Sequence, residues 1–146
     1  SVETTLSSES VYQPLSDIEA LNYLASHNDL VEWFVADNGY LTTDQKIEGA
    51  KAHYNDFGHS EGRTLDNFDE LAYIASHEDL INAFRNDTNN LETNGLSHYI
   101  NHGMSENRST TFDVNSYINN NNLSNQFSND LEAAKRHYID NFISEI

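Results

Sequence analysis

The stretch HYNDFGHSEGR, residues 53–63, gathers side chains of the types that bind metals or transfer protons. It holds two histidines, an aspartate, a glutamate and an arginine around two glycines. Variants of the same phrase occur as HYINHGMSENR at 98–108 and as HYIDNFISEI at 137–146. Self-similarity of this kind is typical of repeat architectures. An active site is normally one asymmetric constellation, so a motif that occurs three times indicates architecture.

A transition-metal or haem site is the first chemical interpretation of the histidines. His98 and His102 are four residues apart, which lets two imidazoles on one helix face share a metal ion. The other copies have a phenylalanine and an asparagine at the place of His102. His53, His98 and His137 recur, each beside a tyrosine and about 100° around the helix from it. We therefore expect hydrogen-bonded structural histidines, and a site at His98 and His102 is the weaker alternative.

Calcium is the second candidate ligand. NGYLTTDQ at 38–45 imitates the second half of an EF-hand loop, but the preceding acidic positions and the final glutamate are absent. The simpler interpretation is a turn followed by a helix that Thr42 or Thr43 caps. A looser calcium site made from Asp37, Asp44 and backbone carbonyls stays open, because hard cations accept irregular oxygen cages.

The sequence contains no phosphate-binding glycine loop, nucleophile elbow or zinc-protease motif. We predict that the protein is not an enzyme and needs no cofactor, with calcium as the alternative. Seven basic against 24 acidic residues give a formal charge of −17, which makes nucleic acid and anionic membranes poor partners. No apolar run is long enough to insert into a membrane, and the absence of cysteine excludes disulfides and thiolate sites.

The chain repeats itself on a larger scale. The segment 18–34 aligns without gaps on 68–84, and a weaker third copy begins at Phe112. Residues 1–14, rich in serine and threonine, are expected to form a flexible leader. The remainder, 15–146, is predicted to be one helical repeat domain with modules at 15–66, 67–111 and 112–146.

Each module is expected to contain about three short helices, which predicts an all-α array. Apolar residues at three-to-four spacing place the first helix. Ser26 with Asp29, and Ser76 with Asp79, match a capping box that would start the second helix. The third helix leads to the His-Tyr pair, and a small residue three positions before its histidine predicts a close helix contact.

The glycines of the repeated phrase suit the end of that third helix. Gly58 and Gly103 are predicted to be left-handed residues just past the helix, and Gly62 and Asn107 to adopt positive φ in the following turn. The glutamate and arginine around that turn are expected to tie it to the start of the next module.

The pattern Y-[LI]-A-S-H-x-D-L-x-x-x-F followed by H-Y-x-x-x-G-x-x-E-[GN]-R resembles a tandem module of large secreted and surface-attached bacterial proteins. Such proteins often carry hemolysin-type calcium repeats or have S-layer-like roles. The resemblance covers nearly everything after residue 15 and implies a secreted or cell-surface location with a role in display, adhesion or assembly. In the first copy it is carried by Tyr23, Asp29, Leu30, Phe34, His53, Tyr54, Gly58, Glu61, Gly62 and Arg63. The second copy carries it on Tyr73, Asp79, Leu80, Phe84, His98, Tyr99, Gly103, Glu106 and Arg108.

We therefore expect a non-enzymatic interaction or self-assembly module that binds another protein or copies of itself. Trp33, Tyr40 and the asparagine run 119–122 are candidate contact residues. The structural alternative is that Trp33 fills the gap between modules. The functional alternative is a ligand-binding module, either for a glycan held on aromatic side chains or for calcium held by acidic loops.

Overall fold

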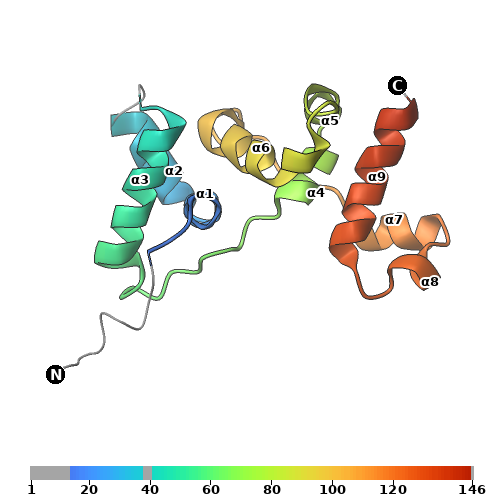
Figure 1. Ribbon diagram of the computed structural model, residues 1–146, viewed down its shortest axis with the longest axis horizontal. Helices are drawn as coiled ribbons and strands as arrows, with labels where there is room; N and C mark the ends of the chain where they lie inside the picture. Colours follow the sequence, from blue (N-terminus) through green and yellow to red (C-terminus); the bar gives the residue numbers. More distant parts are fainter. Residues whose placement is uncertain (1–13, 38–40, 146) are drawn as a thin grey trace. The chain divides into compact units, whose positions relative to one another are not determined.

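A computed structural model describes residues 14–37 and 41–145, without the side chains of 35–37. Within these ranges all regular secondary structure is helical, which confirms the predicted all-α class. The chain divides into two compact units between Asn67 and Phe68 (Figure 1). Except for Pro14, the predicted leader lies outside the described residues.

The first unit contains α1 (Asp17–Ala25), α2 (Asn28–Asp37) and α3 (Thr43–His53), which continues into the π-helical turn η2 (Tyr54–Gly58). Two reciprocal capping boxes fix where helices begin. At α1, Ser16 Oγ accepts from the Glu19 amide at 3.2 Å and the Glu19 carboxylate accepts from the Ser16 amide at 2.9 Å. Thr42 and Gln45 repeat this arrangement at α3, which confirms the predicted cap by Thr42.

The core of the first unit lies where α1 packs against α3. Tyr23 and Leu24 of α1 are fully buried, and so is Ala50 of α3, the small residue three positions before the histidine. Val31 and Phe34 close the core from α2. The predicted close helix contact is therefore confirmed at Ala50, where a larger side chain would hold the two helices apart.

The second unit contains two further sets of short helices. Among them α9 contacts α4, α5, α7 and α8, so residues far apart in sequence share one core (Figure 1). Its elements are α4 (Glu70–Ala75), α5 (Glu78–Ala83), the 3-10 turn η3 (Thr88–Asn90), α6 (Leu91–His98), the π-helical turn η4 (Tyr99–Gly103), α7 (Val114–Asn120), α8 (Ser124–Phe127) and α9 (Leu131–Glu145).

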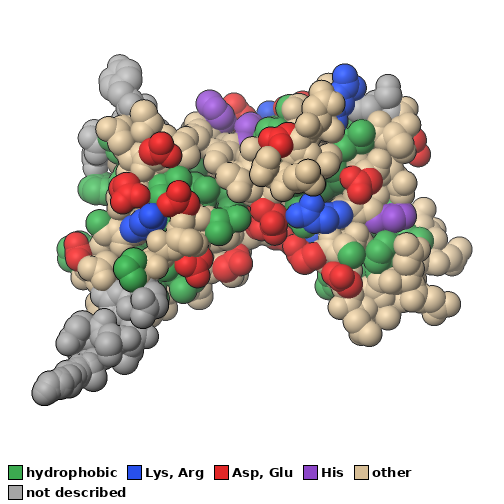
Figure 2. Space-filling model, viewed as in Figure 1, with side chains coloured by type: hydrophobic (Ala, Val, Ile, Leu, Met, Phe, Trp, Pro, Cys, Tyr) green, Lys and Arg blue, Asp and Glu red, His purple; other side chains and the backbone are tan. Residues whose placement is uncertain are grey.

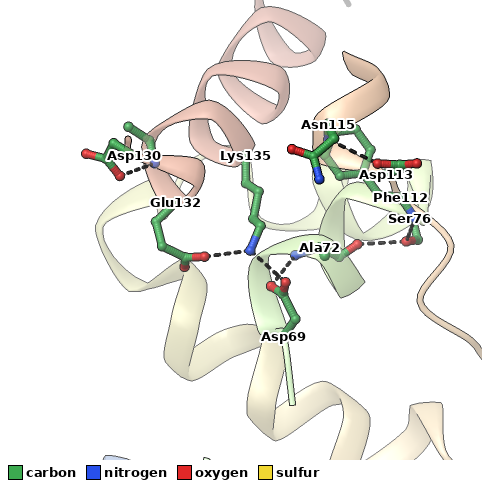
Figure 3. A network of polar contacts seen from close by, with 10 residues as sticks. Asp69, Ala72, Ser76, Phe112, Asp113, Asn115, Asp130, Glu132 and Lys135 are labelled. Atoms are coloured by element: carbon green, nitrogen blue, oxygen red, sulfur yellow. Dashed lines mark hydrogen bonds and ion pairs between the residues drawn. The ribbon is translucent and has the colours of Figure 1, made fainter. Parts of the chain in front are cut away.

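A buried lysine joins α9 to the start of α4 (Figure 3). Lys135 Nζ lies 2.6 Å from Asp69 Oδ2 and 2.6 Å from Glu132 Oε2, and the lysine is only 7% exposed. The other oxygen of Asp69 caps α4 by accepting from the Ala72 amide at 3.0 Å. Burial by itself would lower the pKa of Lys135, but the two carboxylates outweigh it and raise the pKa. The lysine therefore stays charged and holds the two helices together.

The predicted capping boxes at the second helices are wrong. Ser26 Oγ donates to the Asn22 carbonyl at 2.7 Å and accepts from the Asn67 amide at 2.7 Å. Ser76 likewise donates to the Ala72 carbonyl and accepts from the amides of Thr111 and Phe112. Each serine thus fastens the extended segment that follows its module, because distant amides compete successfully for the hydroxyl.

The predicted left-handed conformation of Gly58 and Gly103 is also wrong. Both glycines end a π-helical turn, in which His59 N donates to Tyr54 O at 2.9 Å and Met104 N donates to Tyr99 O at 3.0 Å. The positive φ angles lie four residues later, at Gly62 (71°) and Asn107 (60°), as predicted for those two positions. Gly58 and Gly103 are needed because a side chain at either position would collide with a neighbouring tyrosine hydroxyl.

Candidate functional site

The recurring histidines each bind a tyrosine from the first helix of the same segment. Nδ1 of His53 lies 2.8 Å from the Tyr23 hydroxyl, and Nδ1 of His98 lies 2.8 Å from the Tyr73 hydroxyl. His137 makes the same contact with Tyr117 at 2.6 Å. The prediction of hydrogen-bonded structural histidines is confirmed at all three places.

The glycines leave room for these hydroxyls. A Cβ atom built on Gly58 would lie 2.0 Å from the Tyr23 hydroxyl oxygen, and one on Gly103 would lie 1.9 Å from that of Tyr73. The tyrosines of the His-Tyr pairs complete each cluster, since Tyr54 and Tyr99 pack edge-on against Tyr23 and Tyr73. The π-helical turn thus brings the backbone directly against a buried phenol.

The electrostatics of the cluster favour neutral partners. Burial raises the pKa of Tyr23 and of Tyr73 to about 12, so both keep their protons and can donate. Burial, followed by the nearby Arg63 and Arg108, lowers the pKa of His53 and His98. A neutral imidazole accepts at Nδ1 from the tyrosine and keeps its own proton on Nε2.

Two further histidines hold the extended segments that follow the π-helical turns. Nε2 of His27 lies 2.8 Å from the Thr64 carbonyl, and Nε2 of His77 lies 2.8 Å from the Ser109 carbonyl. Because a carbonyl only accepts, each imidazole donates through Nε2. These contacts confirm the structural role predicted for His27 and His77.

The arginines of the repeated phrase bind within their own segment. Arg63 donates to both oxygens of Asp29 at 3.0 Å and to Glu61 through Nε at 2.8 Å. Arg108 donates from Nη1 and Nη2 to the two oxygens of Asp79 at 2.9 and 2.7 Å, and from Nε to Glu106 at 2.8 Å. The expected tie to the next module is therefore wrong. The fork instead fixes the turn to the second helix, and it holds the pKa values of Asp29 and Asp79 below their usual range.

The structure describes the side chains of three of the four predicted metal residues, His98, His102 and Asp44. The rings of His98 and His102 lie 5.5 Å apart between centroids, but Nδ1 of His98 is engaged by Tyr73. Asp44 is exposed in the first turn of α3, while the side chain of Asp37 lies outside the described residues. Within the described residues no three histidine or carboxylate side chains converge on one point. Calcium binding stays a prediction.

An apolar groove opens beside this framework in the first unit. Trp33 of α2 is 51% exposed and Phe57 of η2 is 55% exposed, although both are large hydrophobic residues. Trp33 stacks edge-on against the buried Phe34 with centroids 4.8 Å apart, and Phe57 lies 5.5 Å from the His53 ring. The groove has a volume of about 350 Å³, and its walls are Asp29, Leu30, Trp33, His53, Phe57 and Arg63.

A second hollow of about 240 Å³ shares Trp33, His53 and Phe57 with the groove. It extends toward Gly49, at which a Cβ would lie 2.5 Å from the Phe34 ring, and it has Asp56 at its edge. Trp33, His53 and Phe57 therefore border both hollows. Of the contact residues expected from the sequence, Trp33 lies here and Tyr40 lies outside the described residues. The asparagines at 119–122 are exposed at the end of α7 and just after it, in the second unit.

Phe57 was missed by the sequence reasoning, although the internal alignment carries a signal for it. The place of Trp33 holds Ala83 in the second segment, and the place of Phe57 holds His102. Of the residues aligned with the groove walls, only Asp79 borders the hollow of the second unit, whose other walls are Glu78, Asn82, Arg85 and Phe142. The aromatic pair is therefore an addition to the first segment and is absent from the second.

The protein carries 24 acidic and seven basic residues. On the face drawn in Figure 2, carboxylate side chains are scattered over the surface and basic side chains are few. The described helices include none that is long and apolar enough to cross a bilayer. A comparison with protein-family models, curated proteins and solved structures finds no match for the chain.

Proposed function

We propose that the protein is a non-enzymatic interaction or self-assembly module of a secreted or cell-surface bacterial protein. One observation carries this proposal: the polar side chains of the repeated motif bind one another, whereas the large apolar side chains at the groove have no such structural role. The tyrosines, histidines, arginines and acids of the repeated phrase bind one another and hold helices together. The large apolar side chains at the groove are left exposed. A scaffold with an exposed aromatic patch is suited to contact with another macromolecule.

The three-module array is part of the same proposal. The Tyr–His hydrogen bond occurs once in each predicted module, and the Asp–Arg–Glu fork occurs in the first two. The module boundary predicted between residues 66 and 67 falls one residue from the division between the two compact units. Recurrence of one set of contacts at matching positions supports modules of a repeat protein.

The secreted or surface location rests on the sequence resemblance and on the composition. A chain without cysteine and with a formal charge of −17 suits a bacterial exoprotein that folds without disulfides. At the surface, millimolar divalent cations would screen the repulsion between acidic copies. Calcium would then promote contact between copies, and this charge is the observation that favours calcium as a ligand.

Light scattering coupled to size exclusion, with millimolar calcium and again with chelator, tests self-assembly. We expect a monomer near 16.6 kDa in chelator and larger particles in calcium. Magnesium at the same concentration is the control for general screening. A monomer under all three conditions would overturn self-assembly and confine the proposal to binding a foreign protein.

A further inference from the structure

The aromatic pair of the first unit is not required by the shared architecture. The second segment forms the same Tyr–His bond and the same arginine fork with Ala83 and His102 at the places of Trp33 and Phe57. An exposed tryptophan beside an exposed phenylalanine exposes apolar surface to water, which is unfavourable unless a ligand covers it. The position of the pair on an otherwise repeated framework marks a site specific to the first unit.

We propose that the groove between α2 and η2 binds one apolar side chain, aromatic or aliphatic, of a foreign polypeptide segment that carries lysine or arginine on either side. The inference rests on the proposed interaction function and names the class of partner. Trp33 and Phe57 form the walls that hold the side chain, and the carboxylates beside them face its basic neighbours.

The size and lining of the groove suit one apolar side chain of the partner. A volume of about 350 Å³ lies at the small end of ligand pockets, which span about 300–1,000 Å³. Leu30, one of its walls, is only 5% exposed, so the inserted side chain contacts an apolar residue that is already largely shielded from water. Large apolar anchors in such pockets provide most of the binding energy of protein interfaces.

The charges around the groove favour basic residues on either side of the partner's inserted side chain. Arg63 is the one basic side chain among the groove walls, and Asp29 and Glu61 occupy its Nη1, Nη2 and Nε groups. One positive charge thus lies against two carboxylates, so this cluster of Arg63, Asp29 and Glu61 is negative overall and disfavours an incoming anion. Asp29 and Glu61 remain 63% and 48% exposed, and Asp56 borders the adjoining hollow. The net negative charge of this rim attracts a basic segment and repels an acidic one.

The same reasoning disfavours a second copy of this chain as the occupant. Each copy carries a formal charge of −17 and contains only seven lysines and arginines. Two copies would bring acidic surfaces together at the groove, and like charges in contact lower affinity. A foreign basic segment satisfies both the apolar walls and the acidic rim.

A random peptide library displayed on phage is the direct test, with the whole chain as bait. We expect selected peptides to carry an aromatic or large aliphatic residue flanked by lysine or arginine. Labelled copies of these peptides should bind about tenfold more weakly to Trp33→Ala and to Phe57→Ala, measured by fluorescence anisotropy. The matched control is the variant Asn82→Ala/Arg85→Ala in the polar hollow of the second unit, which should bind as the unchanged chain does. Because both aromatic residues are exposed, the variants should keep the far-ultraviolet circular dichroism of the fold.

Three outcomes would overturn the proposal. They are a library without basic apolar binders, binders that the two substitutions leave unaffected, and tighter binding of a probe glycan, chitotetraose or cellotetraose, in the groove. Since Trp33 is the only tryptophan, quenching of its fluorescence by either sugar would identify a glycan site directly. Peptides that bind elsewhere, together with calcium-dependent assembly, would leave the interaction function standing and remove only the groove as its site.

Discussion

Substitution of Gly58 by alanine tests whether the π-helical turn exists to admit the Tyr23 hydroxyl. The added Cβ would lie 2.0 Å from that oxygen and 2.8 Å from Cζ, against ordinary contacts of 3.4–4 Å. The phenol would have to retreat by at least about 1.4 Å. Tyr23 is fully buried and bonded to His53 at 2.8 Å, so it cannot retreat without losing that bond. Either the ring or the turn must distort.

The expected loss of stability follows from three effects. Overpacking of a buried site costs about 1–3 kcal/mol, and loss of the Tyr–His hydrogen bond adds about 1 kcal/mol. The better helix propensity of alanine returns at most about 1 kcal/mol. We therefore expect Gly58→Ala to lower the free energy of unfolding by about 1–3 kcal/mol. In urea this corresponds to a midpoint lower by about 1 M or more.

Urea unfolding followed by tryptophan fluorescence measures this change in the relevant unit, because the only tryptophan, Trp33, belongs to it. The matched background is Tyr23→Phe, which removes the clashing oxygen. There the alanine should cost less, with a coupling of about 1 kcal/mol between the two sites. An equal loss in both backgrounds, or a Gly58→Ala protein as stable as the parent, would refute the reasoning.

Three further predictions concern other contacts. Lys135→Ala should destabilise the second unit by about 1–2 kcal/mol, because two carboxylates lose a buried partner. Urea unfolding followed by circular dichroism measures this loss. Lys51→Ala is the control and should change stability less, because Lys51 and its partners are more exposed. Acidification should weaken the fold as the pH falls below about 6.5, because the lowered pKa values of His53 and His98 mean that the unfolded chain takes up protons first. His53→Gln should flatten that dependence of the urea midpoint, and a rise in stability between about pH 6.5 and 5.5 would contradict it. Gly62→Ala should cost about 1 kcal/mol from its φ of 71° alone, since nothing lies within 4 Å of its Cβ position. Asn107→Gly should be close to neutral, also by urea unfolding, and equal effects of the two substitutions would contradict a conformational cause.

Features that depend on short-range contacts were predictable from the sequence. The helical class, the cap at Thr42 and the positive φ at Gly62 and Asn107 follow from residues within a few positions of one another. The structural role of the histidines also followed, because a residue repeated three times at the same helical position indicates packing. Local propensity and periodicity act before tertiary contacts form, so they can be read along the chain.

Predictions failed where a distant group competed with a local one. The sequence Ser26-x-x-Asp29 matches a capping box, but Arg63 binds the aspartate and the Asn67 amide binds the serine. Those partners lie 34 and 41 residues away. A charge-assisted, bidentate contact is stronger than the neutral local bond it replaces. Ser26 and Asp29 therefore make long-range tertiary contacts in place of the local cap that their spacing predicted.

The sequence by itself determined that the chain is helical, acidic and built on a repeated phrase, because composition and periodicity carry that information directly. Only the tertiary structure decided that Gly58 makes room for a phenol and that Trp33 and Phe57 border one groove. Trp33 and Phe57 belong to different helical elements, and they border one groove because the Tyr23–His53 and Asp29–Arg63 contacts hold those elements together. Proximity between segments arises from long-range packing, and no local pattern encodes it.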